Sequence, residues 1–151
     1  GGMSHEHTLK LLDNVKSPNL KLVFDTANPV FTDRRIGPKP YRKQSSWEFY
    51  AHVKEFVEYV HIKDARYIEE TEGIFPKADH VFPGDGDGDV EKIVADLLAN
   101  GYDGGFSIEP HLAVVFHDDS VQSADDVRYN NYIEYGQRFM QLVTSIEALR
   151  K

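Results

Sequence analysis

Apolar residues follow two alternating patterns along the chain. Short runs that are apolar almost throughout end in a charged residue or a histidine, and between them lie longer stretches with apolar residues three or four positions apart. The first pattern is typical of buried parallel strands and the second of amphipathic helices. We expect strands at residues 20–25, 57–65 and 104–109, and helices at residues 4–14, 45–56, 90–101 and 130–149. This order predicts an α/β fold with a parallel sheet, built as a single unit over residues 1–151.

Polar residues mark the expected starts of three helices. Ser4 precedes the first helix, Ser45 or Ser46 the second, and Asp89 the third. Side chains of this kind accept hydrogen bonds from the free N–H groups of a first helical turn. Gly101 follows the third helix, in the position where a left-handed residue commonly ends a helix.

The long connections lack periodicity. Residues 26–44 and 65–82 are expected to form irregular loops, which in α/β proteins carry much of the specificity. Residues 85–96 imitate a calcium-binding loop, but Val90 stands where that loop needs glycine and Asp96 where it needs a bidentate glutamate. We interpret the segment as a glycine-rich connection between a strand and a helix.

Composition narrows the classes of function. The chain has 151 residues, no cysteine and a formal net charge of −8. Any metal must therefore bind through oxygen and nitrogen atoms. The negative charge disfavours nucleic acid, and no run approaches the roughly 20 apolar residues of a membrane span. We expect a soluble, cytoplasmic protein that acts on a small molecule, without a nucleic-acid or membrane partner.

Polar side chains stand at the carboxyl end of each expected strand. Asp25 ends the first, His61 lies near the end of the second, and Glu109 ends the third. In βα folds this edge of the sheet is where loops gather and sites are built. Two carboxylates and an imidazole suit one divalent ion, Mn²⁺, Mg²⁺, Co²⁺ or Zn²⁺, whereas without an ion the carboxylates would repel each other. The alternative for each residue is a local hydrogen bond or a helix cap.

Two further residues lie two positions beyond these candidates. Lys63 follows His61 and, on a strand, points to the same side, where it can hold a phosphate, a carboxylate or an enediolate oxygen. The alternative is a surface lysine paired with Asp64. His111 shares the side of Glu109 if Pro110 leaves the strand straight, and we expect it to contact either substrate or a metal ligand.

Three segments carry a family resemblance. "LVFDTANPV", "YVHIKDA" and "PGDGDGDVEKIVADLLANGYDGGFSIEPH" resemble the sugar phosphate isomerase/epimerase family of xylose isomerase-like TIM barrels, a superfamily that also includes endonuclease IV. The resemblance runs from about Ser4 to the final helix. It implies that the chain corresponds to the C-terminal half of a (βα)₈ barrel, a fold of about 250 residues, with the N-terminal half absent.

The resemblance also implies a ligand set and a reaction. In the family one divalent metal is held at the barrel mouth by Glu, Asp, His and Glu, and Asp25, His61 and Glu109 match the last three. The first Glu has no counterpart in this sequence. The implied function is isomerisation or epimerisation of a sugar or sugar phosphate through an enediolate, with Glu109 and Lys63 as catalytic residues.

Two positions depart from known patterns within the superfamily. Asn28 stands where sugar epimerases often have a histidine, so it can bind a substrate hydroxyl but cannot shuttle a proton. His80 matches a histidine of endonuclease IV and is expected to contact substrate, whereas Ala78 replaces the accompanying aspartate. This replacement argues against a three-metal nuclease site.

Two alternative functions stay open. One is a dehydratase or lyase on the same scaffold, acting on an inosose-type ketone, because enolisation beside a metal-bound carbonyl is the shared first step. The other is a non-catalytic fragment with a vestigial metal site. With half a barrel and open strand edges, the chain alone is expected to be inactive, and to form a homo-oligomer or to associate with the missing N-terminal half.

Overall fold

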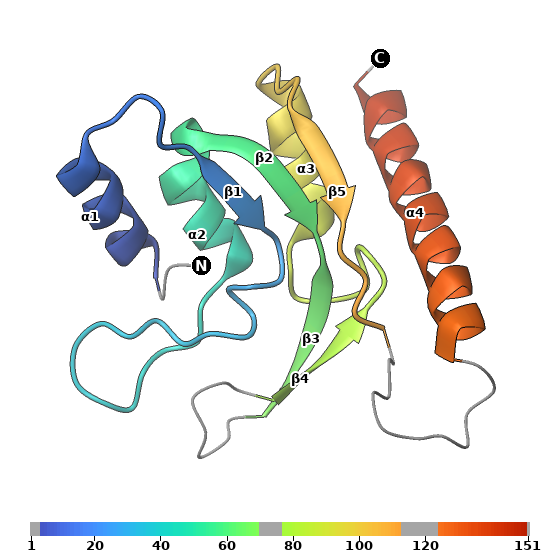
Figure 1. Cartoon of the computed structure of the whole chain (residues 1–151), viewed down its shortest axis with the longest axis horizontal. Helices are drawn as coiled ribbons and strands as arrows, with labels where there is room; N and C mark the ends of the chain where they lie inside the picture. The colour runs from blue at the N-terminus through green and yellow to red at the C-terminus, as the bar shows by residue number, and fades with distance from the viewer. Residues whose placement is uncertain (1–3, 70–76, 113–123, 151) are drawn as a thin grey trace.

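The computed structural model describes residues 4–69, 77–112 and 124–150. Its elements, in chain order, are α1 (His5–Val15), β1 (Leu22–Asp25), α2 (Ser46–Val53) with a short 3₁₀ turn η1 (Lys54–Phe56), β2 (Val57–Ile62), β3 (Asp64–Glu69), β4 (Lys77–Val81), α3 (Val90–Ala99), β5 (Gly105–Ile108) and α4 (Ala124–Leu149). Strands β1, β2 and β5 form a parallel sheet in the order β1-β2-β5 (Figure 1). The predicted parallel α/β plan is therefore confirmed.

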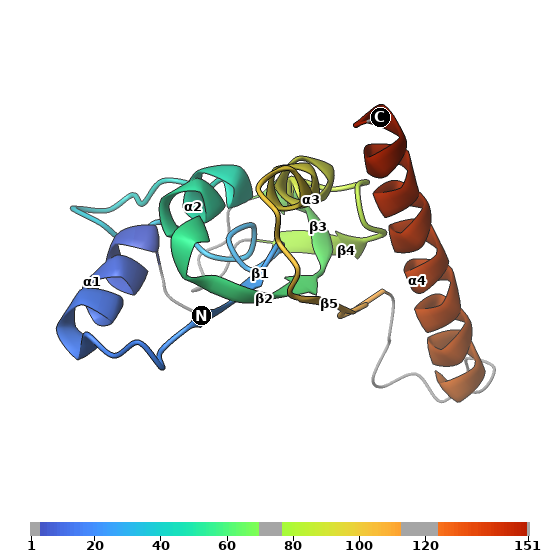
Figure 2. The ribbon, with the colours of Figure 1, turned by 90° about the horizontal axis from the view of Figure 1, so that it is seen from above.

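One face of this sheet carries the hydrophobic core. Helices α2 and α3 lie on the same side of the sheet, with α1 beside α2 and α4 beside α3 (Figure 2). The strand residues Phe24, Val60 and Ile62 alternate with the polar strand-end residues and are buried against these helices. Alternation along a strand sends neighbouring side chains to opposite faces, so the polar residues point away from the helices.

On the opposite face of the sheet, which we call the open face, the described residues place no helix. Val23 and Tyr59 point to this face and are 58% and 37% exposed. Both are large apolar side chains, which closed barrels bury in their interior. A separate observation concerns membranes: no helix in the described residues is long and apolar enough to cross one.

Two of the expected helix caps are present, and one serves a different helix. The side chains of Ser4 and Ser45 accept hydrogen bonds from the backbone N–H groups of His7 and Glu48, at the starts of α1 and α2. Asp89 makes no side-chain bond to its own helix α3. Its Oδ2 accepts instead from the N–H of Trp47, at 3.0 Å, and so ties the start of α3 to the first turn of α2.

A β-hairpin replaces part of an expected loop. Strands β3 and β4 pair antiparallel, so the prediction that residues 65–82 are irregular was wrong within the described part, and the expected strand 57–65 divides at Lys63. Few residues of the hairpin are apolar: Ala65 belongs to a small buried cluster with residues that follow β1, and Tyr67 and Ala78 pack against this cluster. With so few apolar positions, its period-two pattern is weak in the sequence. The final helix also begins earlier than expected, at Ala124.

The glycine-rich loop, residues 83–89, is anchored on one buried carboxylate. Asp64 is 1% exposed and accepts hydrogen bonds from the backbone N–H groups of Gly84, Gly86, Gly88 and Ala65, at 2.8 to 3.0 Å. N–H groups therefore converge at the centre of this loop, whereas a calcium loop directs oxygen atoms inward. A Cβ atom added at Gly86 would lie 2.4 Å from Asp64 Oδ1, so a side chain there meets the anchor.

Candidate metal centre

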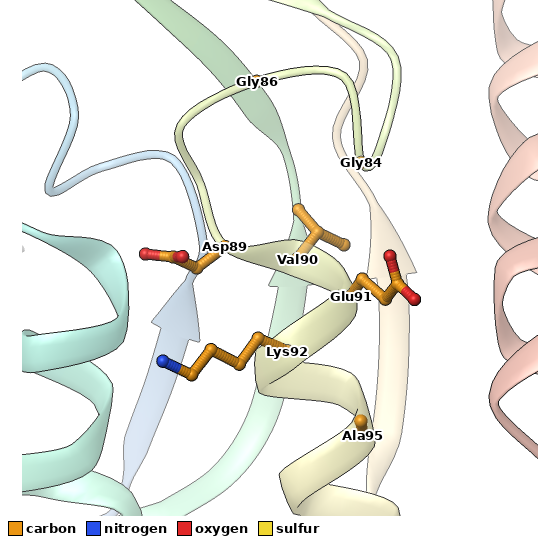
Figure 3. Close-up of a pocket in the computed structure, with 7 residues that line it drawn as sticks. All are labelled: Gly84, Gly86, Asp89, Val90, Glu91, Lys92 and Ala95. Carbon is orange, nitrogen blue, oxygen red and sulfur yellow. The ribbon is translucent and has the colours of Figure 1, made fainter. Parts of the chain in front are cut away.

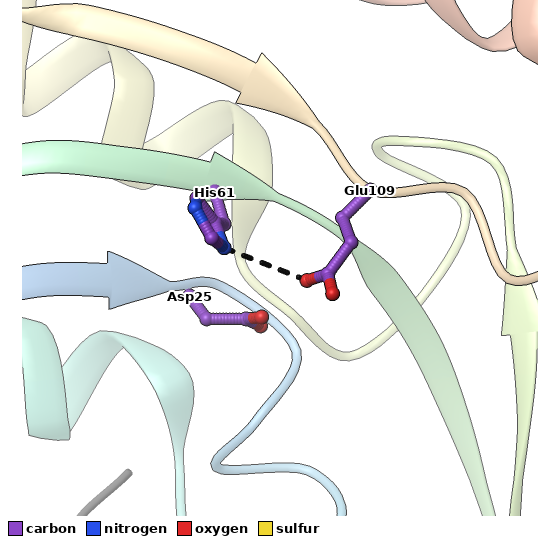
Figure 4. Close-up of side chains that lie close together, drawn as sticks. All are labelled: Asp25, His61 and Glu109. Carbon is purple, nitrogen blue, oxygen red and sulfur yellow. Dashed lines mark ion pairs between the residues drawn. The ribbon is translucent and has the colours of Figure 1, made fainter.

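The three polar strand ends converge on one point. Asp25 and His61 are partners in the parallel register of β1 and β2, and Glu109 follows the last residue of β5 (Figure 4). Each offers one ligand atom, and these atoms all lie within 4.8 Å of one another. Residues in register on parallel strands point to the same face, so the pairing of the sheet itself brings them together.

Asp25 is held in place by the backbone that follows it. Its Oδ1 accepts hydrogen bonds from the N–H groups of Ala27 and Asn28, at 3.0 and 2.9 Å, and its side chain is only 8% exposed. This local turn fixes the carboxylate and leaves Oδ2 directed toward the other strand ends. Asn28, expected to bind substrate, contacts Asp25 through its backbone, and the residue is exposed beside the site.

Glu109 occupies the middle of the group. Its N–H donates to the carbonyl of Ile62 at 3.0 Å, which extends the β2–β5 pairing by one residue and sets the direction of its side chain. Its Oε2 lies 3.6 Å from His61 Nδ1, and its Oε1 lies 3.3 Å from His111 Nε2. Pro110 therefore does not carry His111 away from the glutamate.

Lys63 points into the same group. Its Nζ lies 2.8 Å from Asp25 Oδ2 and 3.1 Å from Glu109 Oε2. The alternative of a surface lysine paired with Asp64 is wrong, because the lysine is 8% exposed and the two residues point to opposite faces. The register explains this: Glu109 is one position beyond the Ile62–Ile108 pair, and so stands level with Lys63.

Thr26 is a positioning residue that the sequence did not indicate. It is fully buried, its Oγ1 accepts from the N–H of Lys63 at 3.1 Å, and it donates to the Lys63 carbonyl. These bonds hold the backbone where the chain passes from β2 to β3. Thr26 directly follows Asp25, but nothing in its local sequence predicts a partner 37 residues away.

The two carboxylates have different pKa values because their surroundings differ. Burial raises the pKa of Asp25, and the nearby Lys63 ammonium opposes that rise. Burial also acts on Glu109, but hydrogen bonds with Asp25, Lys63 and His111 lower its pKa to about 2. The two carboxylates therefore have pKa values shifted in opposite directions, although both lie beside the Lys63 ammonium.

The donor set fits one divalent ion. Carboxylate oxygen and imidazole nitrogen are the ligands that Mn²⁺, Mg²⁺, Co²⁺ and Zn²⁺ accept. Opposite ligands bound at about 2.1 Å from an ion are about 4.2 Å apart, so donor atoms within 4.8 Å of one another have a spacing that suits one ion. Asp25, His61 and Glu109 are therefore the residues that would hold the ion.

His80 and His111 form an aromatic wall beside Glu109. Their rings are stacked with centroids 4.9 Å apart, and the His80 ring is 4.7 Å from that of Phe31. Burial, followed by the positive charges of His111 and Lys63, lowers the pKa of His80 to about 4, so this ring is neutral at physiological pH. Its Nδ1 is buried without a hydrogen-bond partner in the described part of the chain. Contact of either histidine with substrate stays a prediction.

A separate cavity of about 350 Å³ lies at the start of α3 (Figure 3). Its lining includes Gly84, Asp89, Glu91 and Lys92, and none of the three metal-ligand candidates. The ammonium of Lys92 stacks over the Trp47 ring at 4.1 Å. The cavity is thus distinct from the strand-end group, which lies on the open face of the sheet.

Comparison with known proteins supports the architecture. A xylose isomerase domain protein from Planctomyces limnophilus is similar to this chain with a TM-score of 0.63 and 23% identity, covering 96% of this chain and 43% of that one. A xylose isomerase-like TIM barrel protein from Mycobacterium smegmatis, solved in complex with magnesium, has a TM-score of 0.57 and 20% identity, covering 95% and 40%. Likeness at this identity shows a shared fold.

The chain spans about two fifths of the length of these two solved structures. No curated protein matches it significantly. The family described as xylose isomerase-like TIM barrel matches residues 1–130. Together with the parallel sheet and its polar strand ends, this match shows that the chain belongs to the xylose isomerase-like TIM barrel family.

Proposed function

We propose that this chain carries the metal centre of a sugar or sugar-phosphate isomerase or epimerase that works through an enediolate. The observation that carries the proposal is the convergence of Asp25, His61 and Glu109 at the carboxyl ends of three adjacent parallel strands. Membership of the family and the magnesium bound by the similar Mycobacterium smegmatis protein support it. The ion would be one divalent cation, Mn²⁺, Mg²⁺, Co²⁺ or Zn²⁺.

Asp25, His61 and Glu109 would have different roles in the proposed reaction. A bound divalent ion supplies Lewis acidity that polarises the substrate's carbonyl and the neighbouring hydroxyl. Asp25 and His61 hold it from two adjacent strands. Glu109 has two oxygen atoms with different neighbours, so one can serve the ion while the other moves the proton between the carbons.

Four residues around this centre would bind substrate. Asn28 is exposed beside Asp25 and offers an amide to a hydroxyl. His80 is kept neutral, so it can donate or accept a hydrogen bond without bringing a charge, and His111 lies next to it. The Lys63 ammonium is close enough to the centre to hold an enediolate oxygen or a phosphate.

The rest of the barrel would supply what this chain lacks. The open face with Val23 and Tyr59, and the free edges of β1 and β5, need a covering partner. We propose that the remaining strands of a closed barrel provide it, together with a further carboxylate ligand, and that a second copy of the chain is the alternative. Without either partner the chain would turn over little substrate.

Metal binding tests the proposal directly. The chain is expected to bind Mn²⁺ in calorimetric titration, and the double variant Asp25→Ala, Glu109→Ala to lose this binding. The double variant Asp13→Ala, Glu58→Ala is the matched control, because it removes the same charge from two exposed carboxylates. Equal Mn²⁺ binding by all three proteins would show that no metal centre is formed at the strand ends.

The reaction class requires a second measurement. With the rest of the barrel present, enolisation exchanges a hydrogen next to the substrate carbonyl for deuterium from D₂O. Recovery of an isomer or epimer then indicates the proposed function, whereas loss of water indicates a dehydratase acting on an inosose-type ketone. Absence of both exchange and turnover on sugars, sugar phosphates and cyclic ketones would leave the vestigial site as the correct reading.

A further inference from the structure

Lys63 binds the same carboxylate oxygens that the proposed metal would bind. Its ammonium nitrogen is 2.8 Å from Asp25 Oδ2 and 3.1 Å from Glu109 Oε2. Glu109 Oε2 is also the oxygen nearest to His61, at 3.6 Å from Nδ1. The ammonium therefore lies among the donor atoms rather than beside them.

From this geometry we infer that Lys63 is a built-in competitor of the divalent ion. The inference rests on the proposed metal centre and deepens it by describing how the centre is filled. Without a bound ion the ammonium pairs with both carboxylates and offsets part of their charge, and when the ion binds, the ammonium must leave them. An oxygen atom that accepts a hydrogen bond from an ammonium binds a metal ion less strongly. In addition, the ammonium and a metal ion this close together would repel each other strongly.

The surroundings of Lys63 favour an exchange of this kind. Its backbone is fixed at both N–H and carbonyl by Thr26, so the strand does not move with the side chain. The four-carbon side chain is flexible, and its three donors have no fixed direction, unlike the planar fork of an arginine. The displaced ammonium would then lie at the open face, near His111 and the position proposed for substrate.

The competition has a measurable consequence for metal affinity. Lys63→Met removes the ammonium but keeps a long apolar stem, and we expect it to bind Mn²⁺ about tenfold more tightly, or more, in calorimetric titration. Without metal the two carboxylates lose their counter-charge, so the variant should melt at a lower temperature than the parent. Saturating Mn²⁺ should therefore raise its melting temperature more than that of the parent.

Two control variants separate this effect from general electrostatics. Lys54→Met removes the same charge from a lysine that pairs with Asp96 on the helical side, so Mn²⁺ affinity should match the parent. Lys63→Arg retains the charge at the site, and its affinity should not exceed that of the parent. Circular dichroism of each metal-free variant shows that the fold is retained before affinities are compared.

The outcomes distinguish this inference from the proposed function. If the parent binds Mn²⁺ and Lys63→Met binds it no more tightly, the inference is overturned and the metal centre stands. Weaker binding by Lys63→Met would also overturn it, because the lysine would then support the centre. If neither protein binds Mn²⁺, both proposals fail.

Discussion

Lys63 and Asp64 are neighbours in the chain, but they serve different regions of the molecule. Lys63 belongs to the metal-facing cluster, which we define as Asp25, His61, Lys63 and Glu109. Asp64 anchors the glycine-rich loop on the opposite face of the strand. Both side chains are charged and almost fully buried, at 8% and 1% exposure. Burial of a charge is unfavourable unless it is compensated, and the two regions compensate in different ways.

The partners of the two charges explain the difference. Lys63 bonds two side-chain carboxylates, which another cation can also bind. Asp64 accepts from four backbone N–H groups, for which a cation cannot act as the acceptor. We infer that the metal-facing cluster can exchange its cation, whereas the glycine-rich loop keeps its carboxylate anchor as long as the protein is folded.

The largest loss of stability is expected when the carboxylate that anchors the glycine-rich loop is removed. Asp64→Ala removes the acceptor of three N–H groups of the loop and of the Ala65 N–H, and should lower the free energy of unfolding by about 3–5 kcal/mol. Urea denaturation followed by circular dichroism measures the loss. Asp64→Asn keeps one oxygen acceptor and should lose less. A loss below about 1 kcal/mol for the alanine variant would show that water replaces the carboxylate easily, and the contrast would fail.

A substitution at Gly86 tests independently how much the contact with Asp64 stabilises the glycine-rich loop. A Cβ at this position would lie 2.4 Å from Asp64 Oδ1 and 2.5 Å from the Ala65 carbonyl oxygen, so Gly86→Ala should lower stability by about 2–3 kcal/mol. Gly136, inside α4, is the matched control, because its added Cβ would meet only Ile108, at 3.6 Å. Gly136→Ala should raise stability by up to about 1 kcal/mol.

A smaller effect is expected from the titration of His80. Its pKa is lowered to about 4 by burial, so between pH 6.5 and 4 the unfolded chain takes up a proton that the folded chain refuses. Stability is therefore complete above the unfolded pKa and falls as the pH drops toward 4. Because the ring is partly exposed, we expect a loss of about 1–2 kcal/mol, less than the full shift implies.

Comparison with His80→Gln isolates this contribution from the carboxylates that titrate in the same range. The unfolding free energy of the parent minus that of the variant should fall as the pH drops from 7 to 4, because only the parent loses stability through the imidazole. Direct titration of the ring by NMR gives the pKa itself. A value near that of a free histidine would contradict the buried environment that the structure gives this side chain.

The sequence predicted which strand ends carry the metal-facing cluster, but not the ion pairs within it. Apolar runs that end in Asp25, His61 and Glu109 were sufficient to place three polar side chains at one edge of a parallel sheet, because parallel register follows from the βα order. Spacing also placed Lys63 on the face of His61. The ion pairs of Lys63 needed the register of β5 against β2, which no local pattern determines.

The contacts that anchor the glycine-rich loop were harder to predict from the sequence. The glycine-rich loop and the helix after it were predicted, but the anchor Asp64 was expected only as a surface partner of Lys63. Its true partners lie 20 to 24 residues further along the chain and are backbone groups, which carry no residue signature. The partner of Asp89 could not be predicted either, because its side chain accepts a hydrogen bond from α2, which packs beside its own helix α3.

The smallest effect is expected on the open face that carries the metal-facing cluster. Val23 is 58% exposed there, so Val23→Thr should change the unfolding free energy of the dilute chain by less than about 0.5 kcal/mol. In the closed barrel that we propose, the same substitution would place a hydroxyl in the interior, and should weaken association with the remaining strands in sedimentation experiments. A loss above about 1 kcal/mol in the dilute chain would mean that this face is already covered. An unchanged association would mean that the covering partner leaves Val23 in water, and would contradict the proposed closed barrel.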